Sequence, residues 1–286
     1  MKKITALILA LIMCVFCFAA CKKNDTEKDS DTNAVSDTAN VTQKASDSDL
    51  DYIKDKGTMI IGITDFEPMD FIGEDGEWTG FDAELARAVC EKLGVTPVFQ
   101  EISWEAKETE LEAKYIDCIW NGLTINDARK AAMSMSDQYM LNKQVVVVRA
   151  EDAEKYTDLA SLANVTVAAE SGSAGEEAVA EKLPDANYIE KEVQIDALTE
   201  LKSLTVDAAV LDYTMAYYLI NKEGSDFADL VILDLDIADE EYYGIAFRKG
   251  SDATAAVNGI LSELADAGTL VEIAEKYGLE DAIVIG

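Results

Sequence analysis

Short apolar runs alternate with segments of helical spacing over most of the chain, and this alternation constrains the fold more than any other feature. The run Met59–Ile63 has the length of a buried strand, and the run Val95–Phe99 follows a helical segment that stops at Gly94. Strands that alternate with helices in this way build a mainly parallel sheet with helices on its faces. The sequence therefore predicts an α/β fold.

The same pattern continues to the end of the chain. Further strands or extended segments are expected at Ile116–Trp120, Gln144–Val148, Val165–Ala169, Tyr188–Ile189, Ala208–Leu211, Val231–Leu233 and Tyr242–Gly250. Helices are expected at residues 82–93, 159–162, 176–183, 194–204, 213–220, 255–267 and 273–277. Residues 71–78 have the pattern of a small hairpin with a glycine turn, and Asp82 is expected to cap the first helix.

The predicted strand Ile116–Trp120 leads into small and polar residues that are followed by one arginine, Arg129. In α/β proteins, groups that recognise a small anion lie just beyond the carboxyl end of a strand. This stretch is therefore the first candidate for a ligand site.

Charge and composition exclude several classes of function. The chain has 56 acidic and 24 basic residues and a formal net charge of −32, so the phosphates of nucleic acid or of bare anionic lipid would be repelled. It contains no histidine, which removes the Ser-His, Cys-His and His-metal mechanisms. No cofactor, metal site or nucleic-acid partner is expected.

The N-terminus is typical of a secreted lipoprotein. Lys2 and Lys3 precede an apolar run, Ile4–Ala20, which matches a secretory signal peptide rather than a membrane span. The small residues before Cys21 resemble a lipobox, in which the cysteine is acylated, as with palmitate, and becomes the mature N-terminus. Ordinary cleavage or an uncleaved anchor are the alternatives.

Residues 21–50 are predicted to be a disordered tether between residues 1–20, the signal peptide, and the folded part. From Lys22 to about Ser48 the chain has hardly any large apolar side chain, so it cannot bury enough surface to order itself. A flexible chain of this kind spans roughly 6 Å × √n, which would hold the folded part some tens of Å from the membrane.

Only two of the five cysteines, Cys90 and Cys118, lie in the folded part. We interpret both as small buried apolar residues, Cys90 on a helix face and Cys118 in a strand. A disulfide between them is the alternative, which depends on geometry.

Many short blocks between Asp51 and Tyr277 resemble, in order and spacing, the family 3 extracellular solute-binding proteins of polar amino-acid ABC importers. The blocks are Gly62–Pro68, Gly80–Asp82, Trp104, Asp117, Gly122–Ile125 with Arg129, Ser136–Tyr139, Asp207 with Asp212, Gly244–Gly250 and Gly268–Thr269. The resemblance implies a two-lobed, periplasmic-binding-protein-like (type II) fold that closes on its ligand about two crossing strands. It implies lobe 1 at residues 51–148 and 243–286, with lobe 2 at residues 149–242.

The resemblance also implies a function. The protein would be a monomeric, extracytoplasmic, lipid-anchored binding subunit that delivers a polar amino acid to an ABC permease and its ATPase, without enzymatic activity. One alternative is a cyclohexadienyl-dehydratase-like enzyme on the same fold, with Glu67 or Glu170 as general acid. The other is a sensory ligand-binding module.

By the same resemblance, Arg129 matches the arginine that binds the ligand's carboxylate in this family. A guanidinium can take both carboxylate oxygens at once, whereas the alternative is a surface arginine on an acidic helix. Thr124, together with the backbone near Asn121 and Gly122, would complete the first lobe's part of the site.

The second lobe would contribute Ser173 and Ala174, in a turn where free N–H groups at a helix start favour an anion. Asp212 matches the acid that binds the ligand's ammonium group, and its alternative role is a helix N-cap. An amino acid needs both partners because an unpaired buried charge is costly.

Phe66 and Trp104 match positions that flank the ligand's side chain, with core packing as the alternative for both. Asp65, Glu67 and Asp70 are expected to place negative charge at the mouth of the site, which favours a cationic side chain. The sequence departs from the common pattern in the short Gly62–Pro68 loop, which puts the role of Asp65 in question.

Overall fold

The chain divides into two units, Met1–Lys44 and Ala45–Gly286. Our computed structural model describes residues 48–285, all of them in the second unit, so the predicted signal peptide, Cys21 and most of the predicted tether lie outside the described residues. The first described helix, α1 (Asp49–Lys56), begins inside the stretch 21–50 that was predicted to be disordered, because Ser48 caps it and Asp49 pairs with Arg248.

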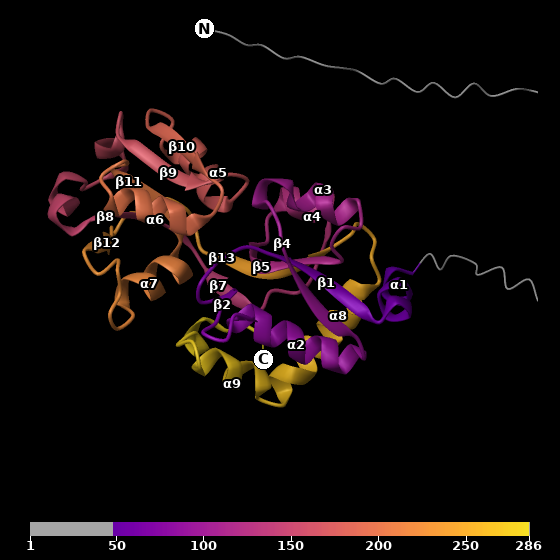
Figure 1. Cartoon of the computed structure of the whole chain (residues 1–286). Coiled ribbons are helices and arrows are strands. Elements are labelled where there is room, and N and C mark those ends of the chain that lie inside the picture. Colours follow the sequence, from indigo (N-terminus) through magenta and orange to yellow (C-terminus); the bar gives the residue numbers. More distant parts are fainter. Residues whose placement is uncertain (1–47, 286) are drawn as a thin grey trace, which may run out of the picture. The chain divides into compact units, whose positions relative to one another are not determined.

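The first lobe is built on a six-stranded sheet (Figure 1). Its strand order is β4 (Thr96–Glu101), β1 (Thr58–Ile63), β5 (Cys118–Thr124), β13 (Glu241–Phe247) and β6 (Ser134–Met135), and β7 (Met140–Asn142) also pairs with β13. The strand β1 runs parallel to both β4 and β5, whereas β13 is antiparallel to β5. The parallel core that the alternating pattern predicted is therefore confirmed.

The second lobe has a five-stranded sheet with an equivalent arrangement. Its order is β10 (Asn187–Lys191), β9 (Thr166–Glu170), β11 (Ala208–Asp212), β8 (Gln144–Arg149) and β12 (Leu230–Ile232). The strands β10, β9 and β11 are parallel, and β8 is antiparallel to β11. The carboxyl ends of β9 and β11 are neighbours, so Glu170 and Asp212 come together there.

The chain passes from the first sheet to the second at Lys143, between β7 and β8. We expected residues 144–148 to end the first lobe, but β8 pairs with β11 and β12 in the second sheet. An apolar strand fits either lobe, and only its partners decide which lobe it joins. The return to the first sheet begins at Glu241, close to the predicted boundary.

Helices cover both sheets. On the first lobe, α2 (Phe81–Leu93), α8 (Ala253–Asp266) and α9 (Thr269–Glu275) lie together, as Figure 1 shows. On the second lobe, α5 (Ala174–Lys182) and α6 (Gln194–Lys202) pack on β9 and β11, with α7 (Tyr213–Asn221) beside β8. The remaining elements are α3 (Lys107–Glu112), α4 (Asp127–Ala132), the hairpin β2 (Phe71–Ile72) and β3 (Trp78–Thr79), and the 3-10 turns η1 (Trp104–Ala106), η2 (Ala150–Lys155), η3 (Leu159–Leu162) and η4 (Glu280–Ala282).

Two expectations about local structure were wrong. The strand that was expected to end at Trp120 runs on to Thr124, because Leu123 and Thr124 pair with Gly244 and Tyr243 of β13. Asp82 is not a helix cap: the N-cap of α2 is Gly80, and the Asp82 carboxylate is buried and accepts from the backbone N–H of Gly122.

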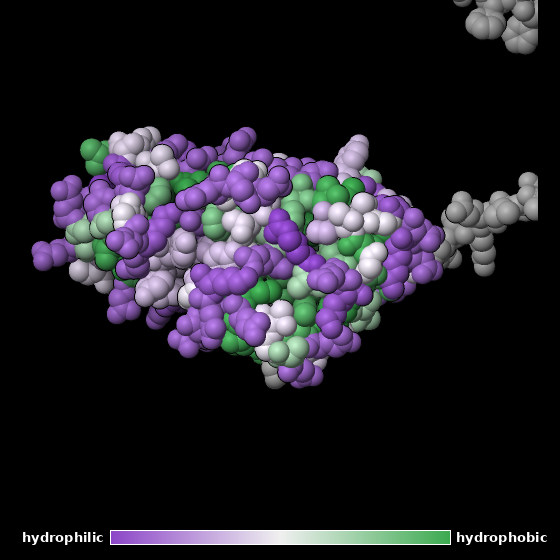
Figure 2. All heavy atoms as spheres, turned by 60° about the horizontal axis from the view of Figure 1, so that its bottom comes forward, coloured by the Kyte–Doolittle hydropathy of each residue, from purple (hydrophilic) through white to green (hydrophobic). Residues whose placement is uncertain are grey.

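Cys90 and Cys118 are both buried, free thiols, so the interpretation of both as small buried residues is confirmed and they do not form a disulfide. Hydrophilic side chains cover most of the face in Figure 2, and hydrophobic ones show only in separate patches. Among residues 48–285, none of the helices has the length and apolar composition that a membrane span requires.

Candidate functional site

Arg129 is held by a short helix at the end of β5 and reaches across to the second lobe. The Asn126 side chain caps α4 by accepting from the Arg129 backbone N–H at 2.8 Å. The guanidinium donates to the Thr124 carbonyl at 2.8 Å and to the Gly172 carbonyl of the second lobe at 3.3 Å. Only 4% of Arg129 is exposed, so the alternative of a surface arginine does not hold.

Asp212 ends β11 and is surrounded by hydrogen-bond donors. One carboxylate oxygen accepts from the Tyr243 hydroxyl at 2.8 Å and from the side-chain amides of Asn142 and Gln144, and the other accepts from Gln194. Burial raises the pKa of Asp212, and these donors together with the charge of Arg129 oppose that rise. Asp212 occupies the N-cap position of α7, but its side chain does not cap the helix.

Glu241, at the start of β13, is a candidate site residue that the sequence analysis missed. One of its oxygens accepts from the Thr124 hydroxyl at 3.0 Å and from the amides of Asn142 and Gln144 at 2.7 and 2.8 Å. Burial, followed by the nearby Asp212 charge, raises the pKa of Glu241 to about 7. Asn142 and Gln144 flank the crossing at Lys143, whereas the predicted lobe boundary lay between residues 148 and 149, so no predicted boundary pointed to them. Glu241 lies beside the predicted boundary at residues 242 and 243, and a polar residue at that boundary was the signal that could have found it.

The turn between β9 and α5 closes the site from the second lobe. The Ser173 hydroxyl caps α5 by accepting from the Glu176 N–H at 3.1 Å, and it donates to the Glu170 carbonyl at 2.7 Å. Ala174 begins the helix. The Gly172 carbonyl accepts from Arg129 and also from the ammonium group of Lys107 at 2.8 Å. Two cations of the first lobe therefore meet one carbonyl of the second.

Lys107 and Glu170 add a buried amine and a buried carboxyl group, and neither was predicted as part of the binding site. Only 4% of Lys107 is exposed, and burial, followed by the charge of Arg129, lowers its pKa to about 8. Burial and the Asp212 charge raise the pKa of Glu170 well above its usual range, and one of its oxygens has no hydrogen-bond donor. Sequence reasoning considered Glu170 only as an acid of the enzyme alternative.

Asn121 and Gly122, which were predicted to help bind the ligand, form hydrogen bonds within the first lobe. The Asn121 side chain accepts from the Thr64 N–H at 2.6 Å and donates to the Thr64 hydroxyl at 3.1 Å. The Gly122 N–H donates to Asp82 at 2.7 Å. In this structure both residues position β5 and the loop after β1.

The aromatic residues that were predicted to flank a ligand are buried here. Phe66 packs edge-on to Tyr243, with 6.3 Å between ring centroids, and lies against Gly122. Trp104 belongs to a core cluster, and the Lys107 ammonium lies 4.9 Å from its ring centroid.

The acidic residues near the loop after β1 divide into two groups. Asp65 is exposed, and partial burial together with Glu67 and Glu101 raises its pKa. Glu67 pairs with Lys222 of the second lobe at 2.8 Å. Asp70 was expected at the mouth of the site, which was wrong: it is fully buried next to Asp82, because the chain turns back into the first lobe there.

Comparison with known proteins decides the family. The family model of the bacterial extracellular solute-binding proteins, family 3, matches residues 59–280. The chain belongs to this family. The two sheets described above are accordingly the two lobes of a solute-binding protein.

The names or titles of three similar proteins give three different amino acids as ligands. The L-cystine-binding protein TcyJ of Escherichia coli (strain K12) is 26% identical over 80% of this chain and 85% of its own. The arginine-binding extracellular protein ArtP of Bacillus subtilis (strain 168) is 31% identical over 78% of this chain and 86% of its own. The crystal structure of an ABC uptake transporter substrate binding protein from Streptococcus pneumoniae with bound histidine is 29% identical, with a TM-score of 0.76 and coverage of 84% and 99%.

Proposed function

We propose that this solute-binding protein is the substrate-binding subunit of an amino-acid ABC importer, and that it binds without catalysis. Arg129 takes the α-carboxylate of the ligand, and Asp212 takes the α-ammonium. The observation that carries this assignment is the burial of both side chains where the two lobes meet, with the Arg129 guanidinium already in contact with the second lobe. A zwitterion inserted between them would have each of its charges paired.

The ligand's side chain is proposed to be polar and cationic. Asp65 and Glu67 in the loop after β1 and Glu101 at the end of β4 carry negative charge, and their repulsion adds to burial in raising the pKa of Asp65, although the Lys222 charge beside Glu67 opposes that rise. A guanidinium or ammonium group would relieve that repulsion, whereas an acidic side chain would increase it. Phe66 and Trp104 would contact the aliphatic part of such a side chain.

We further propose that the protein acts outside the cytoplasm as a monomer, anchored to the membrane through an acylated Cys21. It would deliver its ligand to a permease that is driven by an ATPase. The family membership supports the extracytoplasmic location and the transport role, and the signal and lipobox pattern of residues 1–21 supports the anchor.

Isothermal titration of the full-length protein with each of the twenty amino acids tests the assignment. We expect at least one tight ligand, with cationic amino acids favoured. Arg129→Ala and Asp212→Asn should each weaken the binding of that ligand by roughly 3 to 5 kcal/mol, or more than about a hundredfold in affinity, because each leaves an opposite charge unpaired. Glu151→Gln, at an exposed position far along the chain from these residues, should leave affinity unchanged. Wild-type affinity in a variant that combines Arg129→Ala and Asp212→Asn would rule out the proposed site.

A further inference from the structure

Three carboxyl groups lie next to one another where the two lobes join. Glu170 and Asp212 end the neighbouring strands β9 and β11, and Glu241 begins β13 of the first sheet. Two side-chain amides connect Asp212 to Glu241. Asn142 donates to both at 2.5 and 2.7 Å, and Gln144 donates to both at 2.9 and 2.8 Å. Because the two carboxyls share both donor nitrogens, a charge placed on one of them lies close to the other.

No cation of the protein contacts these three carboxyls. Within residues 48–285, none of the three forms an ion pair with a lysine or an arginine. One oxygen of Glu170 also has no hydrogen-bond donor, although only 2% of the residue is exposed. The charges that act on Glu170 come from both lobes, since Lys107 and Arg129 of the first lobe oppose the effect of Asp212 on its pKa. A positive charge in contact with this group of carboxyls is therefore missing.

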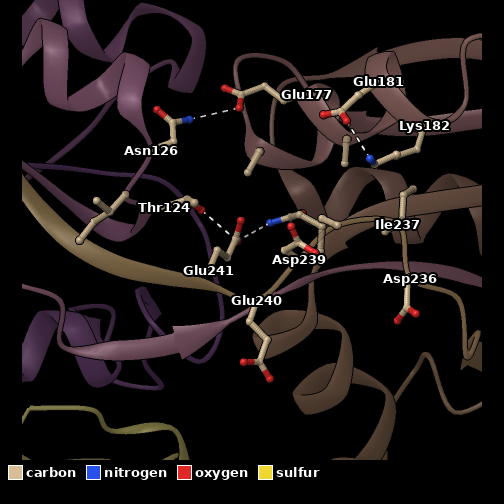
Figure 3. A pocket seen from close by; sticks show the side chains of 15 residues that line it. Thr124, Asn126, Glu177, Glu181, Lys182, Asp236, Ile237, Asp239, Glu240 and Glu241 are labelled. Carbon is tan, nitrogen blue, oxygen red and sulfur yellow. Dashed lines mark hydrogen bonds and ion pairs between the residues drawn. The ribbon is translucent and has the colours of Figure 1, made fainter.

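Glu241 is the member of the three that reaches water. It is half-buried and lines a cavity of about 350 Å³ (Figure 3), whereas Glu170 and Asp212 do not line it. Burial and the Asp212 charge raise the pKa of Glu241 to about 7, and the hydrogen bonds that it accepts oppose that rise. With the chain's own groups alone, Glu241 therefore holds a proton near neutral pH, and the cavity offers that proton a path to solvent.

The other charged groups around Glu241 do not neutralise it. Tyr243 donates its hydroxyl hydrogen to Asp212, and the Arg129 charge opposes the rise in the pKa of Asp212, but Arg129 is assigned to the ligand's carboxylate. The charged residues that line the cavity with Glu241 are Glu177, Glu181 and Lys182 of α5, and Asp236, Asp239 and Glu240 before β13. Lys182, the one cation among these lining residues, pairs with Glu181 at 2.7 Å.

We propose that Glu241 is a second carboxyl of the ammonium site, beside Asp212, and that the amino acid binds with release of a proton from Glu241 to solvent. The inference rests on the proposed function, which places the ligand's α-ammonium against Asp212. An opposite charge within about 4 to 6 Å lowers the pKa of a carboxyl by roughly 1 to 3. Glu241 is then ionised in the complex but protonated in the free protein. Because the free protein holds the proton that the complex releases, affinity should fall as the pH falls below about 7.

Isothermal titration of the full-length protein with L-arginine at pH 6.5, in PIPES and in ACES buffers, tests the proposal. The two buffers differ in ionisation enthalpy, so the difference between the observed heats gives the number of protons released. We expect roughly 0.5 to 1 proton, and an affinity about tenfold or more weaker at pH 5.5 than at pH 7.5. At pH 6.5 the charged groups of arginine do not titrate, and Lys107, with a pKa of about 8, stays charged. If arginine does not bind, the tightest amino acid whose side chain does not titrate near pH 6.5 takes its place.

The variant Glu241→Gln should release less than about 0.2 proton and should bind with an affinity that no longer depends on pH in this range. The change keeps the shape of the side chain, and its amide oxygen can still accept from Thr124. Thermal unfolding checks that the variant folds. Glu240→Gln is the matched control, because this neighbouring residue is exposed, points away from Glu241 in Figure 3 and loses the same charge. It should release protons as the wild type does.

The possible failures separate this inference from the proposed function. Amino-acid binding without proton release would overturn the inference alone, and so would equal release by wild type and Glu241→Gln. Release that is lost only in Glu170→Gln would place the proton on Glu170 and would also overturn it. If none of the twenty amino acids bound, the proposed function would fail, and this inference with it.

Discussion

At the scale of single residues, the buried carboxyls Asp70 and Asp82 stand out because three of their four oxygens have no hydrogen-bond donor. One oxygen of Asp82 accepts from the Gly122 N–H and from the Tyr139 hydroxyl at 2.9 Å, but its other oxygen and both oxygens of Asp70 have no donor. Burial raises the pKa of Asp82 to about 7, and burial with the Asp82 charge raises the pKa of Asp70 well above its usual range. The folded protein therefore keeps protons that the unfolded chain would release.

This pair gives a prediction about stability and pH. An aspartate in the unfolded chain ionises near pH 3.9, so each raised carboxyl should reduce the free energy of unfolding as the pH rises above about 4, by up to about 1.4 kcal/mol per unit, and for Asp82 this decrease ends near pH 7. Asp70→Asn should remove the part of this decrease in the free energy of unfolding that Asp70 causes. In urea unfolding we expect Asp70→Asn to be more stable than wild type, by on the order of 2 kcal/mol at pH 8 and by less at pH 5.

Asp55→Asn serves as the control, because Asp55 is exposed and should give the same small difference at both pH values. A gain from Asp70→Asn that does not grow between pH 5 and pH 8 would contradict the proposed protonation.

Sequence could predict single residues where a local pattern carries their chemistry. Arg129 and Asp212 follow predicted strands within recognisable blocks, and the structure places both where the lobes meet. Gln144, Gln194 and Glu241 follow no such pattern. Gln144 and Glu241 lie at the starts of strands and Gln194 at the start of α6, and these positions, far apart in the sequence, meet only once the two sheets have formed.

At the scale of elements, the turn between β9 and α5 depends on one glycine. Gly172 has a φ of +71°, and a Cβ at this position would lie 3.1 Å from the Glu105 Cα of the first lobe. Its carbonyl accepts from Lys107 and Arg129. The backbone conformation of this turn and the closeness of the two lobes are therefore linked.

We predict that Gly172→Ala weakens amino-acid binding about tenfold, as measured by titration, because the added methyl group holds the lobes apart. The strained φ should also cost about 1 to 2 kcal/mol of stability. Gly76→Ala is a matched control: its φ is +83°, but a Cβ there meets nothing within 4 Å. It should lose similar stability while binding normally, and equal affinities for the two variants would refute the link to closure.

Elements could be predicted wherever their signals are local. The helices α2 and α5 have helical spacing and recognisable ends, which the sequence identified. The predicted length of β5 and the predicted lobe of β8 were wrong, since both depend on pairing with strands that come about 60 residues or more later in the sequence. Local periodicity cannot report such pairing.

At the scale of the whole molecule, few polar contacts join the lobes on the ligand side. They include the Glu67–Lys222 pair, a hydrogen bond from Asn126 to Glu177 at 3.1 Å, the Arg129–Glu177 ion pair at 3.8 Å, and the two donors to the Gly172 carbonyl. Beside the crossing strands, Asn142 and Tyr243 of the first sheet also donate to Asp212 of the second. The two partly exposed contacts, Glu67–Lys222 and Asn126–Glu177, contribute roughly 1 kcal/mol or less each. A ligand that pairs Arg129 with Asp212 can therefore dominate the balance between open and closed lobes, as a transport signal requires.

The proposed anchor belongs to this scale because it would fix the whole molecule to a membrane without touching the site. Every residue assigned to the ligand lies after residue 64, and α1 separates the site from Cys21 in the sequence. Cys21→Ala should therefore move the protein from the membrane fraction to the soluble fraction and abolish palmitate labelling, with amino-acid affinity unchanged, since the acyl anchor would supply most of the membrane binding. Cys17→Ala, which removes a cysteine of the predicted signal peptide but leaves the lipobox position intact, should remain membrane-bound and labelled. If both variants partitioned like the wild type, the membrane attachment would have to come from an uncleaved N-terminal segment rather than from a lipid.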